Sequence, residues 1–340
     1  MSTTARAGGA AGPTLEDVAR VSGVSRATVS RVVRGDVQVT ASKVAKVEAA
    51  VRKLGYVPHS AARSLASRRT GAVALIVPEH ESRVFTDPFF GSAISGVAAA
   101  LDPTDKQLIL VMASSQDDSK LRRFLRGGHA DGLLVMSHHE GDLTQELVDD
   151  APVPVVFIGR PSGSVHAPQV DLDNEEGGRL AARHLLATGR TRIATITGPM
   201  DMTAAIDRHH GFVSELAAAG CAPVAIGHGD FTIGSGETAL AEMMDAGRSF
   251  DALFAGSDLM AIGALRRLQL AGTPVPRDVA MVGFDDITAA ADPTISLTTV
   301  VNPAKDLAER AVRMLVDLIE GEETDRTVII PPWLRIRGTA

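Results

Sequence analysis

The sequence predicts a small all-α head followed by a two-lobed α/β body built on parallel sheets. Residues 14–58 hold three stretches with apolar residues at helical spacing, and from Gly71 onward short apolar runs alternate with helical patterns. Such alternation, with strands that are apolar throughout, is typical of parallel sheets covered by helices on both faces. About nine strands over roughly 270 residues suit two lobes better than one.

The composition is that of an ordinary globular protein, with 45% hydrophobic and 22% charged residues in 340. A single cysteine, Cys221, excludes a disulfide within the chain and suits a reducing compartment, and we expect its thiol in the core. Residues 1–13 are rich in Gly, Ala, Ser and Thr, which predicts a disordered tail without the apolar run of a signal peptide. Nowhere do about 18 apolar residues follow one another. We therefore expect a cytoplasmic protein without a membrane span.

The first two helices of the head are short and closely spaced. Thr14 can cap a helix over residues 15–22, with Asp17 at the capping-box position. Gly23 then provides a turn, and Ser25 can cap the second helix. The apolar side chains of this second helix recur at i, i+3 and i+4, as Val29, Val32 and Val33.

Two short helices joined by a glycine-containing turn form a helix-turn-helix, whose second helix lies in the major groove of DNA. We expect Arg26, Ala27 and Arg31 to contact base edges, with Arg31 as the guanine reader. Thr28 and Ser30 are expected on phosphates. The predicted DNA contacts in the head are therefore Thr14, Ser25, Arg26, Ala27, Thr28, Ser30, Arg31 and Arg34.

The charge is distributed unevenly along the chain. Its net charge of -7 combines +8 over residues 1–70 with -15 over the remainder. An acidic body with a basic head is expected if only the head contacts phosphate. The alternative is an unrelated solvated charge run, but these basic residues coincide with the helix-turn-helix pattern.

A third helix and a short linker complete this part of the chain. Thr40 can cap the third helix, and Tyr56 is expected to pack in the shared core and end the domain near Pro58. Residues 59–70 begin with good helix formers, but the stretch is too short to be a stable helix alone. A partner must bind this segment for it to fold, unless it is an ordinary linker.

The body alternates strands and helices. The expected strands are residues 72–77, 108–113, 132–136, 155–159, 193–197, 224–227, 252–255, 279–284 and 297–301. The expected helices include residues 91–101, 175–188, 208–219, 236–246, 258–271 and 305–320. The segment around Trp333 resembles a last strand, and we expect this side chain in the core.

Open parallel sheets bind ligands at the carboxyl ends of their strands, so the residues that follow each strand are the candidates for a site. No GxGxxG follows the first strand and no GxxxxGK[ST] occurs, so we predict no nucleotide cofactor. The candidates instead include carboxylates, an amide, guanidinium groups and aromatic rings. This mixture of groups suits a polyhydroxylated ligand. The predicted ligand contacts are Asp87, Phe89, Phe90, Arg160, Arg208, Ser257, Asp285 and Asn302.

Several other polar residues have simpler explanations. Asp258 precedes a helix and is expected to be only an N-cap. His138, His139 and Glu140 follow one another, and adjacent histidines on one short stretch rarely bind the same metal ion. We therefore predict a solvated loop and no metal site at these residues. No nucleophile and base pair is evident, and the chain is not expected to be an enzyme.

The stretches TLEDVARVSGVSRATVSRVVRGD (14–36) and LGYVPHSAARSLASRRTGAVALIVP (54–78) resemble the DNA-binding head and hinge of the LacI/GalR family of transcription regulators. The resemblance implies that residues 59–70 form a hinge helix on the operator. It also implies that Leu65 inserts into the minor groove and that Arg63 is the basic residue ahead of it. His59 and Arg34 depart from the family, in which Asn is usual at both positions.

The resemblance continues through the body. DPFF (87–90) is similar to the family's aromatic ligand loop, and Arg208 and Asp285 match its effector-binding arginine and aspartate. Ser257 and Asn302 stand where many members have Asn and Gln. The implied body is a periplasmic-binding-protein-like domain. Its lobes comprise about residues 71–170 with 302–329, and 171–301 with 330–340.

The resemblance implies a repressor that binds a palindromic operator as a homodimer and responds to a small molecule, with a sugar as the first candidate. No leucine heptads follow the last strand, as they do in tetrameric members. A nucleobase-like corepressor remains an alternative, because the sequence does not give the sign of the coupling. A sugar-binding protein without a regulatory role is a further alternative, and steep salt dependence of heparin binding would distinguish the two classes.

Overall fold

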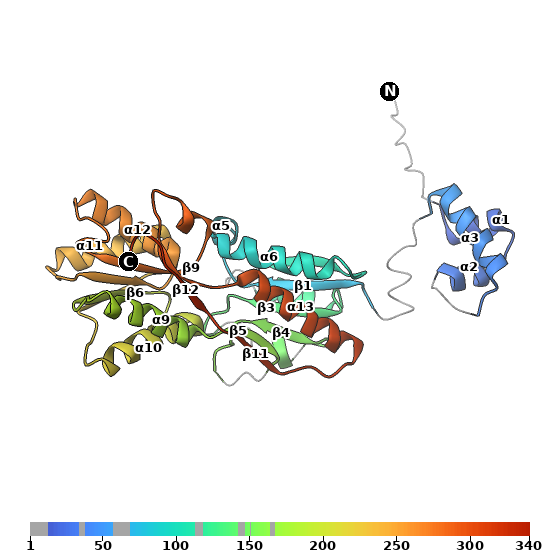
Figure 1. The fold of residues 1–340 in the computed structure, drawn as a ribbon. Coiled ribbons are helices and arrows are strands. Elements are labelled where there is room, and N and C mark those ends of the chain that lie inside the picture. The colour runs from blue at the N-terminus through green and yellow to red at the C-terminus, as the bar shows by residue number, and fades with distance from the viewer. Residues whose placement is uncertain are drawn as a thin grey trace, which may run out of the picture. The chain divides into compact units, whose positions relative to one another are not determined.

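The computed structural model describes residues 13–33, 38–56, 69–112, 118–141, 147–149, 151–163 and 167–340. The chain divides into two compact units, a head over residues 1–70 and a body over residues 71–340, which are described separately (Figure 1). Among the predicted DNA contacts, Arg34, His59, Arg63 and Leu65 lie outside the described residues.

The head contains the three predicted helices, α1 (Leu15–Ser22), α2 (Arg26–Val33) and α3 (Ala41–Leu54). Thr14 and Asp17 form a complete capping box, in which the Asp17 amide donates to Thr14 Oγ1 at 3.2 Å and the Thr14 amide donates to Asp17 Oδ2 at 3.0 Å. Gly23 ends α1 in the left-handed conformation, with φ of 68°. The Thr28 amide donates to Ser25 Oγ at 3.3 Å, as the predicted cap requires.

The core of the head is small. Tyr56 is 5% exposed and packs there, which confirms its predicted place. Thr40 occupies the N-cap position of α3, but its hydroxyl makes no capping hydrogen bond, so the predicted side-chain cap is wrong. The buried residues of this core are Val18, Val29, Val47, Ala50 and Tyr56.

The first lobe of the body is a parallel sheet with strands in the order β11-β5-β4-β3-β1-β2. Successive side chains of β1 point to opposite faces: Val73 and Leu75 pack with α6 and α13, whereas Ala74 and Ile76 pack with α7. This explains why every residue of β1 is buried. The elements are β1 (Ala72–Val77), α5 (Glu81–Thr86), α6 (Pro88–Leu101), β2 (Gln107–Met112), α7 (Asp118–Arg126), β3 (Gly132–Met136), β4 (Val155–Ile158), β5 (Gln169–Leu172), α13 (Ala304–Glu320) and β11 (Thr327–Ile330).

The second lobe repeats this plan with the order β12-β10-β9-β8-β6-β7, in which only β12 is antiparallel to its neighbour. Phe254 and Phe284 pack on the side of α9 and α10, and Leu253 and Met281 pack on the side of α11 and α12. The elements are α9 (Asn174–Ala187), β6 (Ile193–Thr197), α10 (Thr203–Ala218), β7 (Ala225–His228), α11 (Ile233–Asp245), β8 (Ala252–Ala255), α12 (Asp258–Leu270), β9 (Ala280–Asp285), η1 (Thr288–Ala291), β10 (Thr298–Val301) and β12 (Trp333–Arg335).

The chain passes between the two sheets after Leu172, after Val301 and after Ile330. Each lobe is therefore built from separate parts of the sequence, and short segments connect the lobes (Figure 1). Connections of this kind allow hinge motion of one lobe against the other.

Three features of the body differ from the sequence predictions. Strands β5 and β11 were not predicted, and in β5 the polar residues Gln169 and Asp171 interrupt the apolar pattern. Trp333 is 45% exposed on an edge strand, so its predicted place in the core is wrong. Cys221 is only half-buried beside the core.

Candidate ligand-binding cleft and DNA-reading helix

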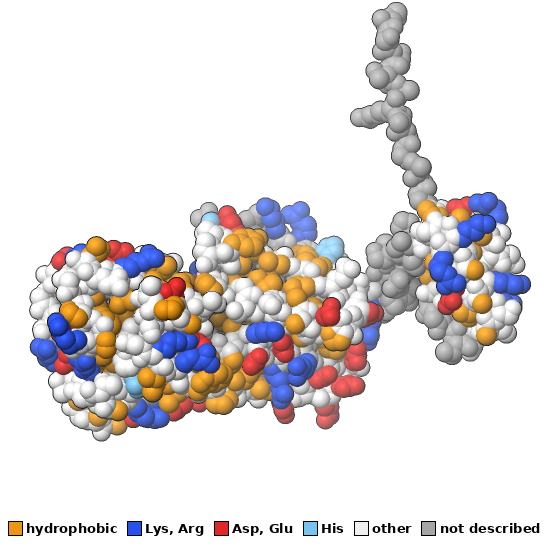
Figure 2. Space-filling model, turned by 45° about the horizontal axis from the view of Figure 1, so that its top comes forward, with side chains coloured by type: hydrophobic (Ala, Val, Ile, Leu, Met, Phe, Trp, Pro, Cys, Tyr) orange, Lys and Arg blue, Asp and Glu red, His pale blue; other side chains and the backbone are white. Residues whose placement is uncertain are grey.

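The α2 helix presents its polar face to solvent, as a DNA-reading helix must. Arg26 pairs with Glu16 of α1 at 2.6 Å, whereas Arg31 has no ion-pair partner within residues 13–33 and 38–56. Ala27 and Arg31 are exposed, and Thr28 and Ser30 are partly buried. Figure 2 shows several Lys and Arg side chains on the visible surface of the head. Arg31 is thus the arginine of this helix most available to a guanine edge.

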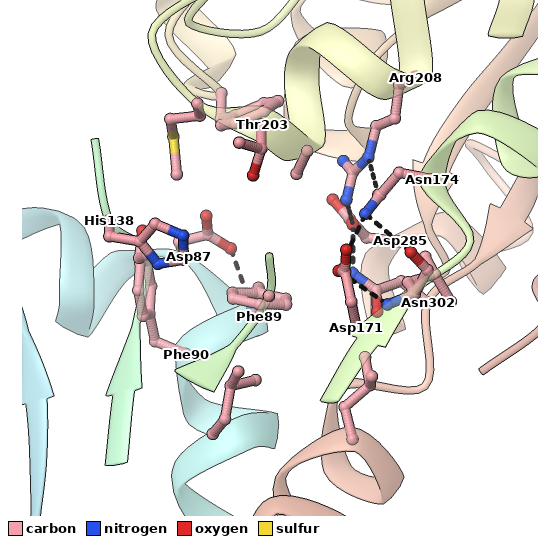
Figure 3. A pocket seen from close by; sticks show the side chains of 18 of the residues that line it. Asp87, Phe89, Phe90, His138, Asp171, Asn174, Thr203, Arg208, Asp285 and Asn302 are labelled. Atoms are coloured by element: carbon pink, nitrogen blue, oxygen red, sulfur yellow. Dashed lines mark hydrogen bonds and ion pairs between the residues drawn. The ribbon is translucent and has the colours of Figure 1, made fainter. Parts of the chain in front are cut away.

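The body contains a cavity between its lobes, with about 760 Å³ of empty space, part of which is open to solvent. Its walls come from the carboxyl ends of strands and from the helices that follow them, as the strand-end rule predicts. The polar and aromatic residues that line it are Arg83, Asp87, Phe89, Phe90, Ser137, His138, Asp171, Asn174, Thr203, Arg208, Phe231, Asp285 and Asn302 (Figure 3).

Arg208 of α10 is the central cation of this cavity. Its Nε donates to Asn174 Oδ1 at 2.9 Å, its Nη1 donates to the Gly256 carbonyl at 2.7 Å, and its Nη2 lies 3.4 Å from Asp285 Oδ1. The guanidinium also lies 3.7 Å from the ring centroid of Phe284. Burial lowers the pKa of Arg208, and Asp285 opposes this most strongly among the neighbouring carboxylates. The side chain is therefore held in one orientation from several sides.

Asp285 and Asn302 complete the same wall. Asn302 Nδ2 donates to Asp285 Oδ1 at 3.1 Å. Asn174 Nδ2 lies 3.3 Å from Asp171 Oδ1, so Asn174 connects Asp171 to Arg208. In Figure 3 these five side chains form one cluster. Such a set of carboxylates, amides and a guanidinium can hold adjacent hydroxyl groups of one ligand.

The aromatic residues lie mainly on the wall formed by the first lobe. Asp87 caps α6, with the Phe89 amide donating to Asp87 Oδ1 at 3.0 Å. Phe89 and Phe90 are in edge-to-face contact, and Phe90 is 1% exposed, so it is mainly a core residue. Arg83 lies over Phe90 and over Phe231 of the other lobe, at 6.0 and 5.6 Å from the ring centroids. Figure 3 shows Phe89 between Asp87 and the Arg208 cluster.

The predicted solvated loop at residues 138–140 is wrong. His138 is buried, lines the cavity and lies with Nε2 2.8 Å from the Arg160 carbonyl oxygen. His139 lies between Glu79 of its own lobe, at 3.2 Å, and Asp201 of the other lobe, at 2.8 Å. The hydrogen bond with Glu79, together with that with Asp201, raises the pKa of His139 to about 9. The loop therefore joins the two lobes instead of lying free in water.

Six of the eight predicted ligand contacts line the cavity, and Arg160 and Ser257 do not. Arg160 instead makes two hydrogen bonds to Asp207 of the opposite lobe, at 2.7 and 2.8 Å. Ser257 is the N-cap of α12 and accepts from the Met260 amide at 3.3 Å, so the cap predicted for Asp258 belongs to its neighbour.

Sequence reasoning missed several residues of the cavity wall. Asp171 and Asn174 were missed because β5 was not predicted, although the strand-end rule would have found them once that strand was placed. Phe231 lies shortly after β7, so the same rule could have predicted it as a residue of the cavity wall. His138 follows β3 closely but was assigned to solvent. Within the described part of the chain, no group of three His, Cys, Asp or Glu side chains could hold a metal ion, and no helix is long and apolar enough to cross a membrane.

Comparison with known proteins agrees with both parts of this architecture. A model of bacterial regulatory proteins of the lacI family matches residues 14–59, and a model of periplasmic binding protein-like domains matches residues 182–340. The HTH-type transcriptional regulator CelR of Thermobifida fusca is 43% identical over 92% of this chain and 94% of its own length. This chain belongs to the lacI family.

The lacI family assignment makes the chain a DNA-binding transcriptional regulator and not an enzyme. The ribose operon repressor of Escherichia coli K12 is 32% identical over 96% of this chain and 99% of its own length. The solved structure of the CelR–cellobiose complex superposes with a TM-score of 0.77, at 40% identity over 96% of this chain and all of that one. The structure of the lac repressor dimer bound to operator and the anti-inducer ONPF superposes with a TM-score of 0.86, at 26% identity over 97% of this chain and 99% of that one.

Proposed function

We propose that this lacI-family regulator is a cytoplasmic, homodimeric repressor that binds a palindromic operator and responds to an uncharged sugar in its cleft, with cellobiose as the first candidate. The observation that carries the proposal is the cluster of five polar side chains in the cavity wall, which faces the aromatic residues of the first lobe. The five are Asp171, Asn174, Arg208, Asp285 and Asn302. Aromatic rings cover the apolar face of a sugar, and the polar groups opposite bind its hydroxyls. The similarity to CelR, solved with cellobiose, supports this class of ligand.

Unpartnered polar atoms in the cavity wall also support a hydroxylated ligand. Arg83 Nε, His138 Nδ1 and Asn302 Oδ1 are buried and have no hydrogen-bond partner in the described part of the chain. All three residues line the cavity. A buried polar group without a partner is costly, so a ligand that supplies donors and acceptors there gains binding free energy.

The charges of the cavity favour a neutral ligand over an anionic one. Asp87, Asp171 and Asp285 contribute three carboxylates. Arg208 is already engaged by Asn174, Gly256 and Asp285, and Arg83 pairs with Glu79 at 2.8 Å. Neither of the two arginines that line the cavity can therefore pair with a phosphate group without giving up a carboxylate partner. A sugar phosphate is therefore expected to bind more weakly than the sugar itself.

Effector binding can change the affinity for DNA through closure of the lobes. Contacts across the cleft already include Arg160 with Asp207, the Thr203 hydroxyl donating to the Arg160 carbonyl, and His139 with Asp201. A ligand held by both walls favours the closed arrangement, because it gains contacts there that an open cleft does not offer. The proposed regulation is this shift, transmitted to the hinge and head.

The proposal is tested by selecting binding sites for the purified protein from a random DNA pool, followed by calorimetric titration with cellobiose, glucose, glucose 6-phosphate and adenine. Enrichment of a palindrome together with binding of cellobiose, and a change in operator affinity on its addition, is the expected result. Binding of adenine alone would replace the sugar by a nucleobase. A protein that enriches no site with or without these ligands would contradict the regulatory role.

Effector affinity is expected to fall as the pH falls below about 6. Burial raises the pKa of Asp87 to about 6 and that of Asp171 to about 6. A ligand hydroxyl donates to the ionised carboxylate, so binding is fully available above this pH and is lost on protonation. At pH 5 each carboxyl should reduce affinity about tenfold, measured by calorimetry between pH 5 and 8.

The neighbours of these carboxyls define the control. Asp87 faces Asp285, Arg83 and Glu79, and Asp171 faces Asp207, Arg160 and Arg208. His139 keeps its proton throughout this range. Asp171→Asn carries no titratable group and should show a shallower pH profile. An unchanged slope in this variant would exclude Asp171 as a source of the effect.

His138→Gln is expected to weaken effector binding about 5- to 10-fold. The Arg160 carbonyl can only accept, so His138 Nε2 carries the proton and Nδ1 is an acceptor. Glutamine keeps a donor for the Arg160 carbonyl but places no acceptor at the position of His138 Nδ1. His184→Gln is the control, because His184 also has a buried nitrogen without a described partner but does not line the cavity. Calorimetry that finds equal affinity for His138→Gln and wild type would remove His138 from the binding site.

A further inference from the structure

The turn after β9 holds Asp285 in an unusual backbone conformation. Asp285 has φ of 109° and Asp286 has φ of 56°, both in the region that favours glycine. Two consecutive residues of this kind persist only when their surroundings hold them. Asp286 is held by Arg335 and Arg337, with Arg335 Nη1 2.7 Å from Asp286 Oδ2. A second contact, at Ile287, holds the turn from α12.

This second contact is made by Asp258, the first residue of α12. Its side chain is fully buried. The Ile287 amide, just after the turn, donates to Asp258 Oδ2 at 2.9 Å, and the Thr299 hydroxyl of β10 donates to Oδ1 at 2.6 Å. Because Ser257 caps α12, the Asp258 carboxyl group is free to hold the turn.

Gly283 of β9 leaves room for this carboxyl group. A Cβ atom at Gly283 would lie 2.3 Å from Asp258 Oδ1, which is closer than any real contact. The glycine is thus required by the side chains that pack over it, Asp258 and Leu297, whose Cδ2 would lie 2.9 Å from the added Cβ atom. Its own backbone has no positive φ that would require glycine. Strand β9, helix α12 and strand β10 meet at this one carboxyl group.

We propose that Asp258 is a positioning residue for the effector: its two hydrogen bonds, to the Ile287 amide and the Thr299 hydroxyl, hold the strained turn that aims Asp285 at Arg208. Asp258 does not line the cavity and acts only through Asp285. This inference rests on the proposed role of the cavity as the effector site.

The hydrogen bonds of Asp258, and not its charge, carry this role. Burial, together with the nearby Asp285 carboxylate, raises the pKa of Asp258 well above its ordinary value. An asparagine fits the same geometry, since its Oδ1 accepts from Ile287 and its Nδ2 donates to the Thr299 hydroxyl. Asp258→Asn should therefore preserve the turn, whereas Asp258→Ala removes both hydrogen bonds.

The test is calorimetric titration of cellobiose into the full-length variants, with operator affinity and thermal unfolding measured alongside. Asp258→Ala and Gly283→Ala are each expected to lower cellobiose affinity roughly 10- to 100-fold, while Asp258→Asn stays within about threefold of wild type. The matched control is Asp251→Ala. Asp251 is a carboxylate of the same lobe that holds another loop, accepting from the Arg192 amide at 3.0 Å, and it is not part of the cavity wall.

Three results separate the possibilities. If Asp258→Ala loses no more affinity than Asp251→Ala, or Asp258→Asn loses as much as Asp258→Ala, the positioning role is overturned. If Asp258→Ala does not fold, Thr299→Val is used instead, because it removes one of the two hydrogen bonds. This variant should lower cellobiose affinity roughly threefold or more, and an unchanged affinity overturns the role equally. If the wild type binds neither cellobiose nor glucose, the proposed effector class fails first and this inference fails with it.

Discussion

Arg208→Ala is expected to abolish the response to the effector. Arg208 is the central cation of the cavity, and its three nitrogens contact Asn174, the Gly256 carbonyl and Asp285. The substitution removes the ligand contact and also leaves the Asp285 carboxylate, which is only 14% exposed, without its cation. Breaking a buried pair from one side typically costs about 3–5 kcal/mol. Calorimetry should detect no cellobiose binding, and the operator complex should no longer respond to the sugar.

Two further variants make this result specific. Arg208→Lys retains the charge but not the planar fork, so it should recover stability more than it recovers effector binding. Arg183→Ala removes a surface arginine of α9, which pairs with Glu176 and Glu215, and should change effector affinity little. A folded Arg208→Ala protein that still responded to the sugar at wild-type concentrations would refute the assignment of this cavity as the effector site.

Arg31→Ala is expected to weaken binding to the selected operator by about 1–3 kcal/mol while leaving binding to random DNA nearly unchanged. Arg31 is exposed on α2 and has no ion-pair partner in the described part of the head, so its fork is available to a guanine. Fluorescence anisotropy with operator and scrambled duplexes at several salt concentrations measures both quantities.

The matched control for Arg31 is Arg52→Ala. Arg52 is also exposed in the head, but it lies on α3, 3.9 Å from Glu48. Its removal should reduce affinity for both duplexes equally or not at all. If Arg31→Ala also weakens both duplexes equally, Arg31 contacts phosphate and some other residue of α2 reads the operator.

The fold of this protein could be predicted well from local patterns. The helices of the head follow from Thr14, Gly23 and the valines of α2, whose capping and spacing are properties of neighbouring residues. Strands such as β1 and β8 are continuous apolar runs and were placed correctly. Strand β5 was missed because Asp171, a residue of the cavity wall, interrupts its apolar pattern, so function here overrides the local signal.

The candidate site was predicted only in part. The strand-end rule points to Asp285, the last residue of β9, and the family resemblance points also to Asp87, the N-cap of α6, and to Arg208 of α10. Arg160 satisfied the same rule but pairs with Asp207, because only the packing of the two lobes decides which partner a strand-end residue meets. For the same reason His138, assigned to solvent, is a buried acceptor in the cavity wall.

The sequence by itself determined the helix-turn-helix, the parallel α/β body and membership of the lacI family, because capping, apolar periodicity and motif order are encoded among residues close together in the chain. Only the tertiary structure decided which side chains share the cleft and which residues hold them. The turn of Asp285 depends on Asp258, Gly283 and Thr299, which come from three elements. Contacts between such distant residues form only when the sheets assemble, and no local pattern reports them.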